Sequence, residues 1–344
     1  MWVGDGSFRR VPPLSEIARV LGPELPRSAW VRRLARVSFL GALDAQPDAK
    51  RRYSRLDHSA GVARLGMAVA DLAHLSASAK RTFVAACLLH DVGHYPLSHS
   101  AEPGFVEALG ADHHEVSRWI VVGAGRIGRK RSLHSALLTI GAKPPDVWGL
   151  IAGESVRGVP SDVAATLSGR VNIDTFDGIW RVGRTFGLPV PRLRADAFDV
   201  RRGRVWLRRE RVPRVDDFWR WKGRVYRDVV NRPSNIVLEA KLSEVARQAT
   251  AEVFEGYETF DDEAFAAWLA DLGRPPAVLD RTHRLVNGAG ECGRLLKEYA
   301  IDTDIRPSLV GLRPQSWAER YQQSKRMVHL ETAPFAAAAA EVRS

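Results

Sequence analysis

Apolar residues recur at helical spacing along most of this chain. Downstream of His58 they follow at steps of four, three, four and three, at Val62, Leu65, Val69 and Leu72. This spacing predicts a helix over residues 56–75 that buries one face, and His58 lies on that face. The apolar run 82–89 ends at His90 and predicts a second helix over 79–92. Both histidines therefore lie on faces directed toward the core, where an unpartnered charge is costly.

The same reasoning extends to the rest of the chain. Further helices are predicted over 28–40, 113–122, 171–186, 216–232, 234–254, 277–285 and 292–300. Asp261 and Asp262 are expected to cap another helix. The segment 197–207 carries Gly203 where a tight turn would fall, which predicts a short β-hairpin. The expected fold class is mainly α, a helical bundle with a C-terminal helical extension and one small β-hairpin.

Breaks in the pattern divide the chain into expected parts. Residues 1–27 are punctuated by Pro and Gly and are expected to form an N-terminal surface segment. Residues 28–187 form the helical core, which ends at a Gly/Pro-containing break. Residues 188–305 form a helical C-terminal region with the hairpin near 197–208. Residues 306–344 form a partly flexible tail, in which 336–340 is a run of alanines.

The pattern brings metal-binding residue types toward the core. Two imidazoles and two carboxylates suit Mn, Fe, Co, Ni or Zn, and can hold Mg with help from water. The residues concerned are His58, His90, Asp91 and Asp174. Any one of them alone is typical of a core histidine or a capping acid. Five of the ten histidines, however, fall within 25 residues, at His90, His94, His99, His113 and His114. This density predicts a site for one divalent metal ion.

The strings around these residues resemble those of a known family. Residues 90–99 read H-D-V-G-H-Y-P-L-S-H, preceded at 55–62 by R-L-D-H-S-A-G-V. His114-Glu115 and the string D-T-F-D-G-I-W-R at 174–181 follow. Together they resemble the HD-domain phosphohydrolases, and more narrowly the branch of deoxynucleoside-triphosphate (dNTP) triphosphohydrolases. The likeness covers roughly residues 28 to 300, and the ten-residue string is its most specific part.

The resemblance implies an HD-domain helical bundle, a homo-oligomer, and a role for each matching residue. It implies that one divalent metal is bound by His58, His90, Asp91 and Asp174. It implies that Arg55 contacts phosphate, and that the reaction centre is lined by His94, His99 and His114. Glu102 would orient His114. Neighbours on a helix diverge by about 100°, so only one of His113 and His114 should face the metal, and the following Glu115 favours His114.

Two further residues admit two interpretations. Arg181 lies seven residues after Asp174, on the same helical face, and would then bind substrate together with Asp177. Alternatively, Arg181 and Asp177 form an i,i+4 ion pair.

The chain differs from the family at positions where family members bind the substrate. Thr175 and Gly178 replace a Lys and a Tyr that hold triphosphate and sugar, and Val182 replaces an Asp. Further on, Val230, Arg232 and Pro233 stand where the family has a Tyr and a basic pair. The metal residues are therefore retained, whereas the substrate contacts are altered.

These residues predict phosphoryl chemistry. A bound metal would polarise phosphorus and lower the pKa of water. His114 would act as general acid or nucleophile. His94, His99 and Arg55 would offset negative charge on the phosphoryl oxygens. The leading hypothesis is a dNTP triphosphohydrolase-like enzyme that releases nucleoside and tripolyphosphate. The first alternative is an HD phosphohydrolase for a smaller phosphoester, such as a nucleoside monophosphate in a biosynthetic pathway. The second is a catalytically weak HD protein that binds nucleic acid. The third is an HD oxygenase with two irons.

Composition limits the class of protein and the cellular compartment that the sequence allows. Hydrophobic residues make up 45% and charged residues 26% of the 344 residues, and no charge-free apolar stretch approaches 18 residues, so no membrane span is predicted. The N-terminus lacks a basic region followed by an apolar block. Cys87 and Cys292 are the two cysteines, which indicates reduced thiols and a cytoplasmic protein.

The net charge of +11 allows two interpretations. Basic residues concentrate at Arg201–Arg214, which is compatible with binding single-stranded nucleic acid, but no aromatic residues alternate with them as a stacking platform would require. A solvated arginine-rich surface is the alternative. For a nucleotide substrate, positive potential also favours encounter.

One glycine-rich segment imitates a nucleotide-binding fingerprint. Gly123, Gly125 and Gly128 form G-x-G-x-x-G after a strand-like run. A dinucleotide site requires a surrounding βαβ unit, but a basic run and Pro144-Pro145 follow without a second strand. We interpret this segment as a Gly-rich helix end.

Overall fold

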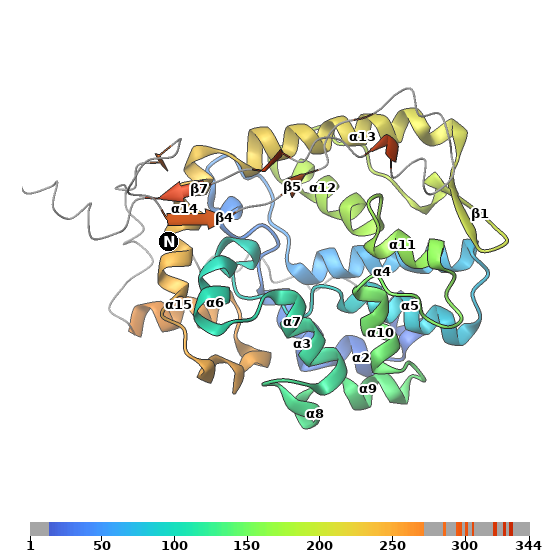
Figure 1. Ribbon diagram of the computed structural model, residues 1–344, viewed down its shortest axis with the longest axis horizontal. Coiled ribbons are helices and arrows are strands. Elements are labelled where there is room, and N and C mark those ends of the chain that lie inside the picture. Colours follow the sequence, from blue (N-terminus) through green and yellow to red (C-terminus); the bar gives the residue numbers. More distant parts are fainter. Residues whose placement is uncertain are drawn as a thin grey trace, which may run out of the picture.

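The computed structural model describes residues 14–271, 285–286, 294–297, 300–301, 305, 319–321, 326–327 and 330–332. Helices dominate these residues, which confirms the mainly α fold class. Two long helices, α4 (Arg55–Leu72) and α5 (Ala77–Leu89), pack along each other near the centre of the molecule (Figure 1). Both were predicted, with ends that shift by one to three residues. Among the described residues, no helix is long and apolar enough to cross a membrane.

The remaining helices surround this pair. They are α1 (Ser15–Leu21), α2 (Glu24–Arg27), α3 (Ala29–Arg33), α6 (Glu102–Leu109), α7 (His113–Arg118), α8 (Gly128–Arg131), α9 (His134–Thr139), α10 (Pro144–Ile151), α11 (Ser161–Ser168), α12 (Ile173–Phe186), α13 (Val212–Val225), α14 (Pro233–Ala246) and α15 (Asp262–Asp271). Helices α7 and α13 continue into the π-helical turns η4 (Trp119–Gly123) and η7 (Tyr226–Val230). Short 3-10 turns connect others, among them η1 (Leu34–Arg36), η2 (Gly41–Ala45) and η3 (Ser98–Ser100).

The predicted hairpin is present. Strands β1 (Phe198–Arg201) and β2 (Arg204–Leu207) pair antiparallel, with Phe198 opposite Leu207. Its tight turn places Gly203 at a φ of 74°, a conformation that favours glycine. In Figure 1 the hairpin lies at one end of the molecule, away from α14 and α15.

The predicted helix over 292–300 is wrong. The described residues there form β4 (Arg294–Lys297) and the start of β5 (Ala300–Ile301). β3 (Leu285–Val286) and β4 flank β7 (Leu330–Thr332) in one sheet, and β5 pairs with β6 (Arg326–Met327). Their partners lie 25 or more residues along the chain, so local periodicity does not reveal them. The helix predicted over 277–285 lies outside the described residues apart from Leu285.

Two other segments differ from expectation. From residue 14 the predicted surface segment forms α1 and α2, and their Ile17, Leu21 and Leu25 are fully buried. The helix predicted over 28–40 ends at η1, because the Ser38 N–H instead donates to Asp262 Oδ2 at 2.9 Å. Val37 is extended and Ser38 forms an isolated β-bridge with Ser54, so the chain is not helical between η1 and η2.

Capping residues decide where the helices begin. Ser54 forms a capping box with Asp57, so that α4 begins at Arg55. Asn172 accepts from the Thr175 N–H at 2.6 Å and starts α12. In the same way Asp112 accepts from the Glu115 N–H at 2.8 Å and starts α7. The first turns of these three helices carry Arg55, His58, His113, His114 and Asp174.

A buried arginine ties the loop after α5 to the C-terminal helices. Arg33 donates from Nη2 to the His94 carbonyl at 2.6 Å and from Nε to the Phe260 carbonyl at 2.7 Å. Its guanidinium stacks over Tyr257, whose hydroxyl donates to the Gly93 carbonyl at 2.8 Å. The side chains of Arg33 and Tyr257 therefore fix the loop over 91–98 through the carbonyls of His94 and Gly93.

Candidate metal centre

Four donor atoms converge where the first turns of α4 and α12 meet the end of α5. The distance from His58 Nε2 to Asp174 Oδ1 is 2.9 Å, and that to His90 Nε2 is 3.3 Å. Asp91 Oδ2 lies 3.5 Å from His58 Nε2 and 3.4 Å from His90 Nε2. The structure thus brings His58, His90 and Asp174 into one group of possible metal ligands, and Asp91 lies beside both imidazoles.

The outer nitrogens of both rings already have partners. His58 Nδ1 lies 2.9 Å from Asp177 Oδ2, and His90 Nδ1 lies 3.0 Å from the Cys87 carbonyl. When both Nδ1 atoms donate, as acceptor oxygens require, both Nε2 atoms face the carboxylates of Asp91 and Asp174, where each can carry a proton or bind a metal ion. Ligands about 2.1 Å from one ion lie about 3.0–3.4 Å apart, close to the separations found here. The residues therefore fit a divalent metal ion.

The electrostatics of the site agree with a cation. Burial by itself lowers the pKa of His90, but Asp91 and Asp174 outweigh it and raise that pKa to about 9. For His58 too, the carboxylates of Asp174 and Asp177 overcome burial and raise the pKa. Asp91 and Asp174 hold low pKa values despite their burial. Both carboxylates are thus ionised ligands for a positive charge.

Asp177 and Arg181 do not line the cavity at this site, which corrects their expected role in substrate binding. Arg181 Nε donates to Asp177 Oδ2 in a buried ion pair, and its Nη2 donates to the Asp57 carbonyl at 2.6 Å. Asp177 in turn orients His58. The i,i+4 ion pair was therefore the correct alternative, and it fixes a metal ligand.

A glycine allows this arrangement. A Cβ at position 61 would lie 2.1 Å from Asp177 Oδ1 and 2.7 Å from Arg181 Nη2. Gly61 lies on α4 one turn after His58, so its missing side chain lets α12 bring the ion pair against α4.

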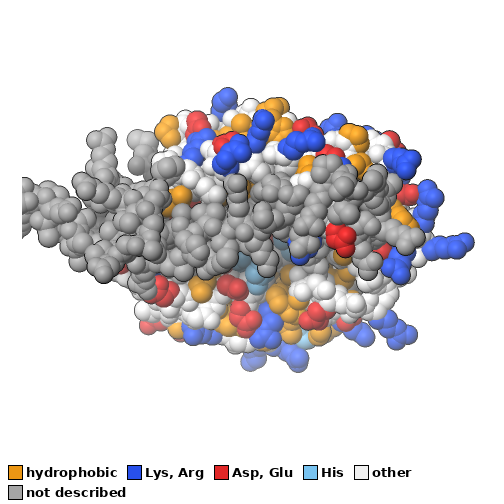
Figure 2. All heavy atoms as spheres, turned by 45° about the horizontal axis from the view of Figure 1, so that its top comes forward, with side chains coloured by type: hydrophobic (Ala, Val, Ile, Leu, Met, Phe, Trp, Pro, Cys, Tyr) orange, Lys and Arg blue, Asp and Glu red, His pale blue; other side chains and the backbone are white. Residues whose placement is uncertain are grey.

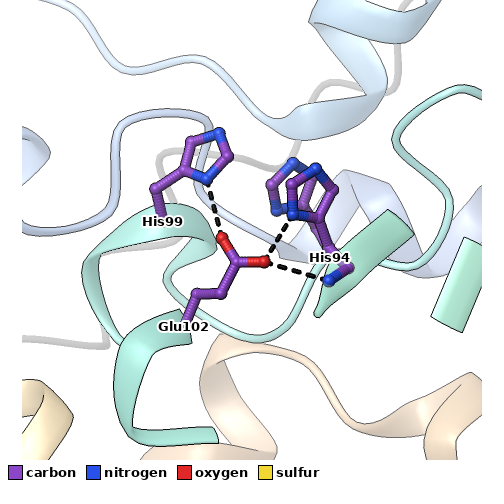
Figure 3. Close-up of side chains that lie close together, drawn as sticks. His94, His99 and Glu102 are labelled. Atoms are coloured by element: carbon purple, nitrogen blue, oxygen red, sulfur yellow. Dashed lines mark hydrogen bonds and ion pairs between the residues drawn. The ribbon is translucent and has the colours of Figure 1, made fainter. Parts of the chain in front are cut away.

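A second polar cluster lies beside the first. Glu102 lies beside His99 (Figure 3), with its Oε2 2.8 Å from His99 Nδ1. Its Oε1 is bonded to His113 Nδ1. The same Oε1 accepts from the His113 N–H at 2.9 Å. Burial by itself would raise the pKa of Glu102, but hydrogen bonds from His113 and His99 hold it well below its usual range. Glu102 is thus an ionised acceptor for two imidazoles.

This geometry corrects the choice between the adjacent histidines. Glu102 orients His113, which is buried, whereas His114 is exposed. Gly93 makes the approach possible, because a Cβ there would lie 2.4 Å from the His113 carbonyl and 2.3 Å from the Ser117 N–H. The only sign of this close approach in the sequence was the position of Gly93 relative to the helix that begins at His113.

His94 is fully buried between the two clusters. Its ring stacks on His113 with centroids 4.0 Å apart, and its Nε2 lies 3.3 Å from Asp91 Oδ1. Neither ring nitrogen has a hydrogen-bond partner among the described residues. Burial, with Arg55 and His113 nearby, lowers the pKa of His94 well below its usual value, so its ring is neutral.

Arg55 joins the metal residues to the wall of the site. Its Nη1 donates to Asp91 Oδ2 at 2.7 Å and its Nε to Ser98 Oγ at 2.7 Å. The guanidinium also lies over the ring of Phe39 at 4.9 Å, and Phe39 packs on His58 at 4.7 Å.

A cavity of about 450 Å³ opens onto these residues. Its polar lining includes Arg55, His58, His90, Asp91, His99, His113, His114 and Asp174. The residues that depart from the family pattern also line it, at Thr175, Gly178, Val182 and Val230. Sequence reasoning did not single out the other lining residues as part of the site: Phe39, Leu40, Leu43, Ser100, Ile179, Val225, Tyr226 and Glu239. Histidine side chains are visible near the centre of the face in Figure 2.

The glycine-rich segment is a helix end, as interpreted from the sequence. Gly123 closes η4, and Gly123, Gly125 and Gly128 all have positive φ before the short helix α8. Among the described residues no parallel strand accompanies it.

Comparison with known proteins agrees with the site. The family model "HD domain" matches residues 55–138, which include Arg55, His58, His90 and Asp91. A search of curated proteins found no match. Among solved structures, a phosphohydrolase from Bacteroides thetaiotaomicron is similar in fold, with 18% identity and a TM-score of 0.58. That alignment covers 73% of this chain and 68% of the other.

Residues 55–138 therefore match an HD domain, and the helical fold is similar to that of the solved phosphohydrolase. Within this fold His58, His90 and Asp174 lie close enough together to hold a metal ion.

Proposed function

We propose that this protein is a metal-dependent phosphohydrolase that acts on a nucleotide. The observation that carries the proposal is the pairing of two sites across one cavity. The facing Nε2 atoms of His58 and His90 suit a metal, and the anchored imidazole of His113 suits proton transfer. Phosphoester hydrolysis requires both functions.

A metal held by His58, His90, Asp91 and Asp174 would supply polarisation of a phosphoryl oxygen and a lower pKa for water. Arg55, which is always protonated, lies beside these ligands and binds an oxygen of the phosphoryl group. Because Asp91 and Ser98 hold its guanidinium, Arg55 is positioned before substrate enters.

His113 is the group best placed to handle the proton of the leaving oxygen. Glu102 accepts from its Nδ1, which directs Nε2 away from the carboxylate and fixes the orientation of the ring. His99 shares the same carboxylate through Nδ1 and lines the cavity, and desolvation lowers its pKa to about 4, so its Nε2 is an acceptor for a water molecule or a substrate donor. His94 is a neutral, buried ring that supports His113 by stacking.

The test is hydrolysis by purified protein with Mn²⁺ or Mg²⁺, measured as release of phosphate, pyrophosphate or tripolyphosphate from separate pools of nucleotides. Release of tripolyphosphate from dNTPs would support the dNTP triphosphohydrolase branch. Release of phosphate from monophosphates would support the smaller phosphoester.

Variants sharpen the test. Asp91→Asn should abolish hydrolysis, whereas His74→Asn should retain it. His74 is an exposed histidine with a φ of 50°, which Asn tolerates. No hydrolysis of any pool by the wild-type protein, or equal rates in Asp91→Asn, would contradict the proposal.

A further inference from the structure

The cavity has two chemically different halves. One half is formed by the imidazoles and carboxylates described above. The other half is apolar and comes from three separate elements: Leu40 and Leu43 around η2, Ile179 and Val182 on α12, and Val225 and Val230 on α13 and η7. An apolar wall of this size recognises an organic group rather than charge.

Helix α12 runs from one half to the other. Asp174, Gly178 and Val182 follow each other at four-residue steps and line the cavity together. At 1.5 Å per residue, Val182 lies about 12 Å along the axis from the metal ligand. A phosphate at Asp174 therefore leaves room for one organic group of nucleoside size over Gly178 and Val182.

Gly178 keeps this route open. A Cβ there would meet Phe39 at 3.6 Å and His58 at 3.7 Å, which are ordinary contacts, but anything larger would extend over the metal residues. The absence of a side chain at this position lets the organic group of a substrate lie against α12 directly beside the phosphate.

The charges of the cavity do not match a polyphosphate. Among the described lining residues, Arg55 is the one Lys or Arg, and it already binds Asp91. Asp91, Asp174 and Glu239 bring three carboxylates to the same lining. Sites for triphosphates surround the chain of phosphates with several cations. Here the residues beyond the metal are Ile179, Val182 and Val230 instead.

We propose that the substrate carries a single phosphate, esterified to an apolar or aromatic organic group such as a nucleoside. This inference rests on the proposed function and names the substrate class of the same cavity. Water adds to phosphorus, the P–O bond to the organic group breaks, and the leaving oxygen takes a proton. The products are inorganic phosphate and the free alcohol.

The first test compares dAMP, dADP and dATP, which share one nucleoside, with Mn²⁺ present. The expected result is a kcat/KM for dAMP that exceeds that for dATP by about tenfold or more, because Arg55 is the one Lys or Arg that the described residues bring to the cavity lining. A second pair, phenyl phosphate against glycerol phosphate, isolates the apolar wall, and phenyl phosphate should be hydrolysed faster. Preference for dATP, or for glycerol phosphate, would overturn the inference and leave the proposed function standing. No hydrolysis of any compound would overturn both.

The second test adds the missing charge. Val230→Lys places a cation at a half-buried position of the apolar wall. The ratio of kcat/KM for dATP to that for dAMP should rise about two- to fivefold, the contribution of one partly exposed ion pair. Leu138→Lys makes the same change at an exposed leucine outside the cavity and should leave the ratio unchanged. An unchanged ratio in Val230→Lys, with normal hydrolysis of dAMP, would count against the apolar wall as the reason for the preference.

Discussion

Glu102 Oε1 binds both the backbone N–H and the ring Nδ1 of His113, so one carboxylate oxygen fixes the first residue of α7 and its side chain together. The neighbouring His114 also lines the cavity, but it has no such anchor. The two histidines are adjacent in sequence and differ by about 100° around the helix. This relationship assigns the proton-transfer role to His113.

The pair therefore predicts unequal effects of matched substitutions. His113→Gln should lower kcat by about 10²–10⁴-fold, the usual contribution of a general acid, whereas His114→Gln should lower it by less than about tenfold. Steady-state kinetics with equal metal loading of both variants decides this. A larger loss in His114→Gln would return the role to that residue.

Asp177 is expected to act through His58. Asp177→Asn weakens the acceptor that fixes the His58 ring, and loss of such an outer partner typically costs about 10–100-fold in metal affinity. Titration of the metal-free protein with Mn²⁺ or Zn²⁺ measures this. Asp71→Asn, at an exposed aspartate paired with Lys80, is the control and should bind metal normally. Equal affinities in the two variants would show that Asp177 has no part in the metal site.

Metal should stabilise the folded protein. The ligands come from α4, the end of α5 and α12, and therefore converge only in the folded state, so binding raises the free energy of unfolding. At a metal concentration about 100-fold above the Kd, the gain is about 2.7 kcal/mol, and thermal unfolding in Mn²⁺ should occur at a higher temperature than in chelator. His90→Ala should lose this difference. A wild-type melting curve that does not respond to metal would contradict the site without reference to activity.

Two glycines provide a matched test of packing. Gly61→Ala places a Cβ 2.1 Å from Asp177 Oδ1, so it should lower the free energy of unfolding by about 1–3 kcal/mol and weaken metal binding. Gly178→Ala makes only ordinary contacts and should be close to neutral. Denaturant unfolding of both variants measures this, and equal stabilities would show that α4 and α12 do not approach as closely as described.

A buried carboxyl predicts a pH dependence of stability. Burial of Asp44, together with nearby Asp262, raises its pKa from 3.8 to about 7, although the Leu40 N–H donates to it. Between about pH 4 and 7 the folded state therefore binds more protons at Asp44 than the unfolded state. Asp44 thus contributes stability at low pH that is lost as pH rises through this window, by up to about 1.4 kcal/mol per pH unit.

Asp44→Asn removes this titration. The variant should gain stability relative to the wild-type protein as pH rises from 5 to 8, measured by urea unfolding at each pH. A constant difference between the two proteins across that range would mean that Asp44 titrates normally.

Much of the helical core could be predicted from the sequence, because its signals are local. The apolar steps after His58 predicted α4, and the run before His90 predicted α5, to within a few residues. Capping chemistry is local as well, so Asp261, which accepts from the N–H groups of Glu263 and Ala264, was placed correctly at the start of α15. Asp216 was expected to begin a helix, but Pro213 allows α13 to begin earlier, at Val212. The buried Asp216 pairs with Arg320 instead.

The sequence by itself determined which residue types could meet: imidazoles and carboxylates on apolar helical faces, spaced as in an HD domain. Tertiary structure decided their partners. It placed Glu102 on His113, brought the Asp177–Arg181 pair of α12 behind His58, and lined the cavity with Val182 and Val230. The physical reason is the distance along the sequence over which each kind of signal acts. Periodicity and capping depend on neighbours within a few residues, whereas these contacts join positions up to 119 residues apart and depend on how closely two helices approach.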